Sequence, residues 1–577
     1  MRATNMKKII LKTQLLLAAM VAVAMLFTVS AQAAAPGITG PTFALTAAAN
    51  YLNQPDGQAV YSWGYGCTTA PAAVSFAPAG LTKTAFCNTM QVPGPTLIVT
   101  EGQTVTVTLT NSLPAAAGNT SILFPGFNVC TATFSAGTGA CTGTPTGVTG
   151  LLTQEAAPGS TVTYSFVASS PGTRAYYSGT QGDLQIEMGL YGAIIVLPTA
   201  VPSACTSGTH ASNLAAEAFW GEKDFRLPNA SGQVGAAYDH PDTCYDREYL
   251  FQFAEMDPSI HTQADAQVKA ANCAAGSATC RLNVPTEPYH PAYFLINGRS
   301  MPDGMDPNYA SEYPHQPYNG DPHMHPGELT LIRVIGQGRW QHPFHEHGNH
   351  VRILARDGNL ILANSSLTYG GTSALALAGP LLFTTTTTPG LAFDGIFYWT
   401  AKGLNWDAYG HNPTSKDPSA TARCTPDVNG YNTGAPTAIN YYEWCQDHNK
   451  PVEKAPFGDI NGGGPTTLPD PNLFTNGPWY GGSPYLGPDA TTRATGCTAA
   501  GTQANGPNST QAGAQCGQTG STPPSGTIAN SPSSEAGFAF MWHSHNEREI
   551  TTNNIFPGGM LMMMLVDSRE YQIDETN

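Results

Sequence analysis

Apolar and polar residues alternate with a period of two along much of the chain between residues 36 and 198. The runs at 104–109 and 161–166 show this alternation, and 193–197 is continuously apolar. Alternation indicates half-buried β-strands, and a short apolar run is consistent with a strand buried on both faces. This first segment is therefore predicted to be a β domain, and 199–246 is predicted to be a linker with helical potential over 211–219.

A second set of strand patterns occupies residues 247–577. Its predicted strands are 247–254, 293–296, 328–335, 395–400, 538–545 and 559–566. Between 402 and 534 the periodicity is lost, and Gly, Pro, Thr, Asn and Asp prevail. Because this stretch is too long for an ordinary loop, we expect a Gly/Pro-rich insertion in the second domain, partly ordered by disulfides.

The N-terminus and the cysteines predict a secreted or periplasmic protein. Three lysines precede an apolar run at 15–29, and small residues at 31–33 favour cleavage near Ala33, as in a Sec-type signal peptide over residues 1–33. No other stretch is long and apolar enough to span a bilayer. All twelve cysteines follow the signal. Local disulfides are the simplest account, although sequence leaves the connectivity open. The neighbouring pairs are Cys67 and Cys87, Cys130 and Cys141, Cys205 and Cys244, Cys273 and Cys280, Cys424 and Cys445, and Cys497 and Cys516.

Charge excludes some classes of partner. Only 11% of residues are charged, and the formal net charge is −16. Removing residues 1–33 takes away four basic residues and no acidic one, so the mature chain carries about −20. Such a chain is poorly suited to nucleic acid or to an anionic membrane surface. It suits cationic metal ions or basic partners.

Two histidine-dense segments carry the candidate chemistry. The first is His342-Pro-Phe-His345-Glu-His347, and the second is His543-Ser-His545. On an extended strand an H-x-H pair points both side chains to one face. Two such strands side by side would offer His345, His347, His543 and His545 to one metal, and neutral imidazole suits copper and zinc. The alternative is that these histidines are solvated loop residues or polar groups of the core.

These segments resemble the multicopper oxidase family. The family's motif H-x-x-H-x-H is matched by His342, His345 and His347, and its motif H-C-H-x-x-x-H falls on His543, Ser544, His545 and Glu549. The segments 92–97, 101–105 and 189–196 resemble the family's first domain. The resemblance implies an all-β fold with two cupredoxin-like Greek-key β-sandwich domains at 36–198 and 247–577, the second carrying the insertion 402–534. It also implies a type 2 copper position for His345 and type 3 positions for His347, His543 and His545.

The chain departs from the family at most of its copper ligands. Ser544 replaces the type 1 cysteine, and Glu549 replaces the second type 1 histidine. The first-domain motifs H-W-H-G and H-S-H fall on 123–126 and 177–179, which contain no histidine. Met560 lies several residues too late for an axial ligand. Because a blue copper centre needs a thiolate, we expect neither that centre nor full four-electron reduction of oxygen.

Three further residues or groups lie outside the set of four candidate ligands. His342 is either a weaker metal ligand beside Ser544 and Glu549 or a hydrogen-bonded core histidine, and we favour the core interpretation. The His323-Met-His325 run is flanked by prolines and is interpreted as a loop. Glu346 is predicted to face solvent.

Two hypotheses about function follow. In the first, a secreted multicopper-oxidase-like protein binds copper or zinc at the remaining histidines, with residual oxidation of metal ions. In the second, a metal-free cupredoxin scaffold is a structural or partner-binding component of an extracellular or periplasmic assembly. The family includes two-domain members that assemble as homotrimers, and the resemblance implies that possibility here. A homotrimer would not restore the copper cluster, because every first domain lacks the same histidines. Completing it would take a different extracellular partner chain.

Overall fold

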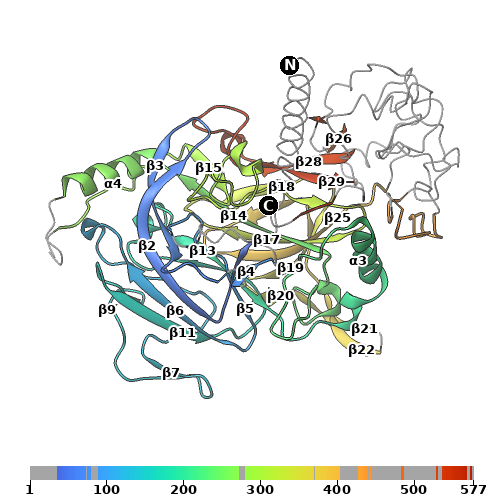
Figure 1. The fold of residues 1–577 in the computed structure, drawn as a ribbon, viewed down its shortest axis with the longest axis horizontal. Helices are drawn as coiled ribbons and strands as arrows, with labels where there is room; N and C mark the ends of the chain where they lie inside the picture. The colour runs from blue at the N-terminus through green and yellow to red at the C-terminus, as the bar shows by residue number, and fades with distance from the viewer. Residues whose placement is uncertain are drawn as a thin grey trace, which may run out of the picture.

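The computed structural model describes residues 35–72, 75–78, 87, 89–271, 280–369, 371–402, 426–438, 441–444, 482–486, 528–529, 536–567, 569 and 572–574. Strands dominate this part of the chain, and helices are few and short (Figure 1). The prediction of an all-β fold is confirmed. The predicted signal peptide and most of the predicted insertion lie outside the described residues. No helix among the described residues is long and apolar enough to cross a membrane.

The first half of the chain forms two sheets that pack face to face. In β6 every second residue is buried, as its alternating sequence predicts. One large core cluster joins apolar residues of both sheets, including Phe43, Leu97, Val107 and Ile194. One sheet has the order β12 (Gly172–Tyr177), β13 (Tyr191–Leu197), β5 (Leu97–Thr100), β1 (Gly37–Thr39) and β4 (Phe76–Ala77). The other has the order β11 (Thr161–Val167), β6 (Thr104–Asn111), β2 (Thr42–Asn53) and β3 (Ala59–Cys67).

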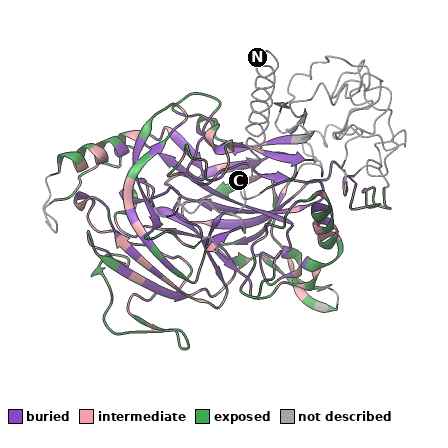
Figure 2. Ribbon diagram, in the orientation of Figure 1, coloured by how far each residue is buried: buried purple, intermediate pink, exposed green. Residues whose placement is uncertain are grey.

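The second half forms another pair of packed sheets around an aromatic core that contains Phe253, Phe344, Phe397 and Trp542. One sheet has the order β15 (Tyr293–Ile296), β14 (Arg247–Met256), β17 (Leu329–Gly336), β25 (Ala392–Tyr398), β19 (Val351–Arg356) and β20 (Asn359–Leu360), with β23 (Leu381–Leu382) beside β19. The other has the order β16 (His323–Met324), β29 (Leu561–Asp567), β28 (Ala536–Ser544), β18 (His342–Glu346) and β24 (Thr384–Thr387). Its β26 (Gly482–Leu486) pairs with β28 and with β27 (Ile528–Ala529). Figure 2 shows that the central strands of this half, such as β14 and β17, are buried.

Short hairpins and helices complete the described chain. The hairpins join β7 (Thr133–Ser135) to β8 (Ala140–Thr142), β9 (Val148–Thr149) to β10 (Gln154–Glu155), and β21 (Leu362–Tyr369) to β22 (Thr372–Leu377). The helices are α2 (Gly182–Gln185), α3 (Gly208–Trp220) and α4 (Pro258–Ala270), with 3-10 turns at Ala115–Ala117, Ser203–Thr206, Pro241–Thr243, Asp303–Met305 and Glu547–Ile550. Helix α3 covers the stretch of helical potential at 211–219. Helix α4 begins where the Asp257 carboxylate accepts the Ser259 amide and Pro258 occupies the first turn.

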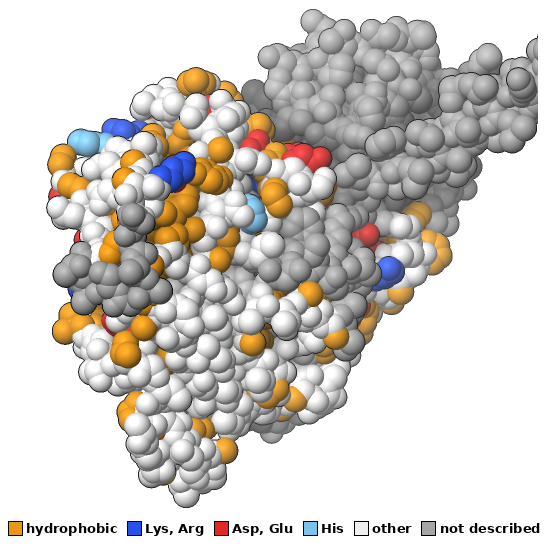
Figure 3. All heavy atoms as spheres, turned by 60° about the vertical axis from the view of Figure 1, so that its left-hand side comes forward, with side chains coloured by type: hydrophobic (Ala, Val, Ile, Leu, Met, Phe, Trp, Pro, Cys, Tyr) orange, Lys and Arg blue, Asp and Glu red, His pale blue; other side chains and the backbone are white. Residues whose placement is uncertain are grey.

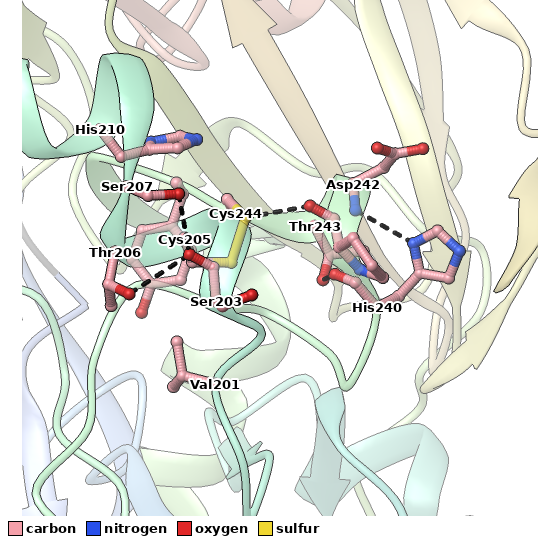
Figure 4. The surroundings of a disulfide bond; sticks show 12 residues. Val201, Ser203, Cys205, Thr206, Ser207, His210, His240, Asp242, Thr243 and Cys244 are labelled. Carbon is pink, nitrogen blue, oxygen red and sulfur yellow. Dashed lines mark hydrogen bonds between the residues drawn. A yellow bond between two sulfur atoms is a disulfide. The ribbon is translucent and has the colours of Figure 1, made fainter. Parts of the chain in front are cut away.

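Three of the predicted disulfides are confirmed: Cys67–Cys87, Cys130–Cys141 and Cys205–Cys244. Figure 4 shows that Cys205–Cys244 ties the start of the segment after β13 to the strand-like stretch before β14. The other three expected pairs each include residues outside the described part of the chain. On the face turned forward in Figure 3, Lys and Arg side chains are few and scattered, so that face offers no basic stripe for nucleic acid.

The two halves are joined by a buried carboxylate. Asp394 of β25 is 1% exposed and accepts hydrogen bonds from the Thr173 hydroxyl of β12 (2.6 Å) and from the Tyr238 hydroxyl (2.5 Å). Arg333 of β17 lies 3.7 Å from the same carboxylate and also pairs with Glu248 at 2.8 Å. A buried charge is tolerated when its lone pairs are satisfied in this way.

Replacing this carboxylate should loosen the contact between the halves. We expect Asp394→Asn to lower the free energy of unfolding by roughly 2 kcal/mol, because a charge-assisted network is lost in a buried site. The exposed Asp183→Asn is the control and should change it by less than about 0.5 kcal/mol. Urea unfolding measures both, and equal stabilities of the two variants would contradict the account.

Candidate metal centre

The two histidine-dense segments form neighbouring antiparallel strands. In the pairing of β18 with β28, His345 faces His543, Phe344 faces Ser544, and Glu346 faces Trp542. Because strand side chains alternate between faces, the ladder has two chemically different sides. His345, His347, His543 and His545 lie on one side, while His342 and Ser544 lie on the other.

The four imidazoles on the first side lie against one another. The ring centroid of His345 lies 4.8 Å from that of His347, 4.7 Å from that of His545 and 5.5 Å from that of His543. The His347 and His543 rings are 5.2 Å apart, and their Nε2 atoms are separated by 3.3 Å. The four candidate ligands that the sequence predicts on one face are therefore brought together.

The cluster has a buried floor and an open side. His345 and His543 are 3% and 8% exposed, whereas His545 is exposed. Burial, followed by the neighbouring His347, His545 and His543, lowers the pKa of His345 to about 3. Burial also lowers the pKa of His543. Both rings are therefore neutral at ordinary pH, which is the form that binds metal ions.

Hydrogen bonds orient the two buried rings. His345 Nδ1 is 2.6 Å from the hydroxyl of Thr384 on β24, and His543 Nδ1 is 2.7 Å from the Ser544 carbonyl oxygen. Such a bond at one ring nitrogen fixes the tautomer and the direction of the other. For His543 this directs Nε2 toward His347.

The donor set fits a copper or zinc ion in part. Two nitrogens that each bind a metal at about 2.0–2.1 Å in tetrahedral geometry lie roughly 3.3–3.4 Å apart, which matches the 3.3 Å between His347 and His543. Among the described residues, however, no three His, Cys, Asp or Glu side chains have donor atoms already arranged around one ion. The His345 and His545 rings lie next to this pair, with centroids 4.7 Å apart.

The other side of the ladder holds a buried ion pair. His342 Nδ1 lies 2.9 Å from Glu549 Oε2, and His342 Nε2 lies 3.0 Å from Glu255 Oε2 of β14. Ser544 donates its hydroxyl proton to the same Glu549 oxygen. With both ring nitrogens directed at carboxylates on opposite sides, His342 lies apart from the four-imidazole cluster. It is the hydrogen-bonded core histidine of the favoured interpretation.

Charge keeps His342 protonated. Burial alone would lower its pKa, but the hydrogen bonds and charges of Glu255 and Glu549 outweigh burial and raise the pKa to about 9. Glu255 was not found from the sequence, since it is 87 positions from His342. The available signal was a glutamate directly after the predicted strand 247–254.

Two sequence interpretations on this part of the chain are wrong. Glu346 does not face solvent: it is 1% exposed, burial raises its pKa well above the ordinary value, and it accepts the Thr385 hydroxyl proton at 2.9 Å. His323 is not in a loop but in β16, which pairs with β29. Although burial opposes it, Asp321 and Asp567 raise the His323 pKa to about 10. His325, next along, contacts Glu222 at 3.1 Å.

The first-half positions that correspond to the missing histidines are filled by other groups. Leu123 pairs with Tyr177 in an isolated bridge. Next to them, the Ser121 hydroxyl lies 2.9 Å from the Thr180 hydroxyl, and it accepts the Gly179 amide at 3.1 Å. A Cβ placed on Gly179 would lie 2.8 Å from Leu123, so the site is also closed sterically. None of these residues is a histidine or a cysteine.

One family model matches part of the first half of the chain. Residues 72–201 match the family model described as multicopper oxidase. Over these residues the chain is similar to the multicopper oxidase family. No curated protein sequence matches the chain.

Several solved structures resemble this chain, with low sequence identities and low TM-scores. They include the multicopper oxidase mgLAC (14% identity, TM-score 0.38, 91% of this chain and 86% of that one) and the blue copper oxidase from Nitrosomonas europaea (13%, 0.39, 91% and 85%). The copper nitrite reductase from the same organism matches at 19% identity and a TM-score of 0.33, over 62% and 84%. The likeness to the family therefore rests on the match over residues 72–201.

The His342 ion pair should make stability depend on pH. A group whose pKa is about 6.5 when unfolded and about 9 when folded stabilises fully below 6.5, and this contribution is lost as the pH rises toward 9. We expect His342→Gln to be less stable than wild type by about 3 kcal/mol at pH 6. The difference should shrink steadily between pH 6.5 and 9.

Urea unfolding at half-unit pH steps measures this difference. His290→Gln, an exposed histidine outside the pair, is the control and should follow the wild-type pH profile. A wild-type advantage over His342→Gln that grows with pH would contradict a protonated His342.

Proposed function

We propose that this chain is an exported multicopper-oxidase-like protein that binds one copper or zinc ion through His345, His347, His543 and His545. The convergence of these rings on one face of the β18–β28 ladder is the observation that carries the proposal. The neutral state of His345 and His543 and the 3.3 Å spacing of two Nε2 atoms support it. His342 is not part of the proposed set.

Export is part of the proposal. Three disulfides in the described chain support an oxidising compartment, because such bonds are rare in the cytosol. The signal-peptide pattern at residues 1–33 supports the same conclusion.

Copper at this site would supply one-electron redox chemistry toward a metal-ion substrate. The residues limit what else is proposed. Ser544 offers no thiolate, and its hydroxyl donates a hydrogen bond to Glu549. We therefore propose that the metal-ion substrate reaches the copper directly, on the side where His545 is exposed. Four-electron reduction of oxygen is not proposed, because Leu123 and Gly179 stand where further ligands would be needed.

The second candidate is a metal-free scaffold that acts as a structural or partner-binding component of an extracellular assembly. It is favoured by one observation: no three potential ligands among the described side chains already surround one position. Direct measurement of bound metal separates the two candidates.

Metal content of the exported protein tests the proposal. We expect about one copper or zinc per chain by inductively coupled plasma mass spectrometry after loading and desalting. His345→Ala/His543→Ala should lose at least nine-tenths of it, since both buried rings are removed.

The matched control is His290→Ala/His240→Ala, which removes two histidines outside the cluster and should leave the metal content unchanged. Copper-loaded wild type should also lack the intense visible absorption of a thiolate–copper bond. No retained metal in wild type, or equal metal in the two double variants, would favour the scaffold.

A further inference from the structure

Two methionines lie on the same face of the sheet as the imidazole cluster. Met541 precedes His543 by two positions on β28, so both side chains project to one side. Across the next strand, Met563 of β29 stands directly opposite Met541, and Leu561 stands opposite His543.

On its other side Met541 lies next to a histidine. The register that pairs His345 with His543 continues to His347 and Met541, and the His347 amide donates to the Met541 carbonyl at 3.4 Å. His347, Met541 and Met563 thus form one row across three strands. Directly opposed residues have Cβ atoms about 4.5–5.5 Å apart, so Met541 lies within side-chain reach of both His347 and Met563.

Burial separates this pair from the other methionines of the same strands. Met560, Met562 and Met564 are at most 1% exposed and belong to the aromatic core on the opposite face. Packing explains them, as it explains most methionines in cores. Met541 and Met563 are half-buried and outside that core, with Met563 packed only at the edge of a small cluster of Ala539 and Leu565.

Thioethers change the metal that such a site prefers. Imidazoles alone suit Cu(II) and Zn²⁺, whereas soft sulfur ligands select Cu(I). We propose that Met541 and Met563 join His347 and His543 in a mixed imidazole–thioether site that holds copper as Cu(I). The inference rests on the proposed metal site and names the oxidation state and two further ligands.

The arrangement also explains how a site without a thiolate would favour the reduced metal. The two sulfur atoms carry no charge, and both side chains are half-buried on the face of the sheet opposite the aromatic core. Binding to them adds no anionic ligand, and anionic ligands would stabilise Cu(II) over Cu(I). The chain therefore keeps soft ligation beside its imidazoles, although Ser544 offers none.

Competition for Cu(I) tests the thioether ligands. The mature chain, without metal and in anaerobic buffer, is titrated with Cu(I) against the chromophoric chelator bicinchoninate. We expect Met541→Leu/Met563→Leu to bind Cu(I) at least tenfold more weakly than wild type, with Zn²⁺ affinity changed less than twofold. Leucine keeps the side-chain volume, so the fold is retained. Copper X-ray absorption should show sulfur scattering in wild type and none in this variant.

Met562→Leu is the matched control, since Met562 is the neighbour of Met563 on the opposite face. It should leave Cu(I) affinity unchanged. Unchanged Cu(I) affinity in Met541→Leu/Met563→Leu, while His345→Ala/His543→Ala loses both metals, would overturn the thioether ligands and keep the imidazole site. Failure of wild type to bind Zn²⁺ or Cu(I) would overturn both.

Discussion

The antiparallel register of β18 with β28 is the constraint on which the candidate site depends. By placing His345 opposite His543, it decides the face on which every neighbouring side chain lies. A slip of one residue would send the imidazoles into the aromatic core and His342 into solvent. The core itself prevents that slip, because Phe344 and Trp542 are fully buried on the opposite face. Packing on one side of the ladder therefore fixes the chemistry on the other.

The two sides of this ladder have opposite electrostatics. On the side of the four imidazoles, burial and the neighbouring histidines keep the buried His345 ring neutral and able to bind a metal ion. On the core side, Glu255 and Glu549 hold His342 as a cation. Ser544 and Glu549, which stand in place of copper ligands of the family, are thus connected through His342 to Glu255 on β14. Where the family resemblance places a type 1 copper, this chain has a hydrogen-bonded ion pair that stabilises the fold.

The sequence predicted what depends on local pattern and missed what depends on distant partners. Alternation located β6, β11 and the two histidine strands, and neighbouring cysteines predicted three disulfides that are confirmed. Glu346 was misplaced because a charged residue in an alternating strand was taken to face water. Burial raises its pKa well above the ordinary value, so a neutral carboxyl fits the core. The strand that contains His323 was not predicted, because its pairing partner, Leu565, is far along the chain.

The most direct test of the central claim is a crystal structure of the copper-loaded protein with anomalous data collected at the copper edge. The account predicts one anomalous peak within about 2.0–2.1 Å of nitrogen atoms of the imidazole cluster, with His342 still between its two carboxylates. A peak at His342, Glu255 and Glu549 instead, or no ordered peak among the four imidazoles, would contradict it.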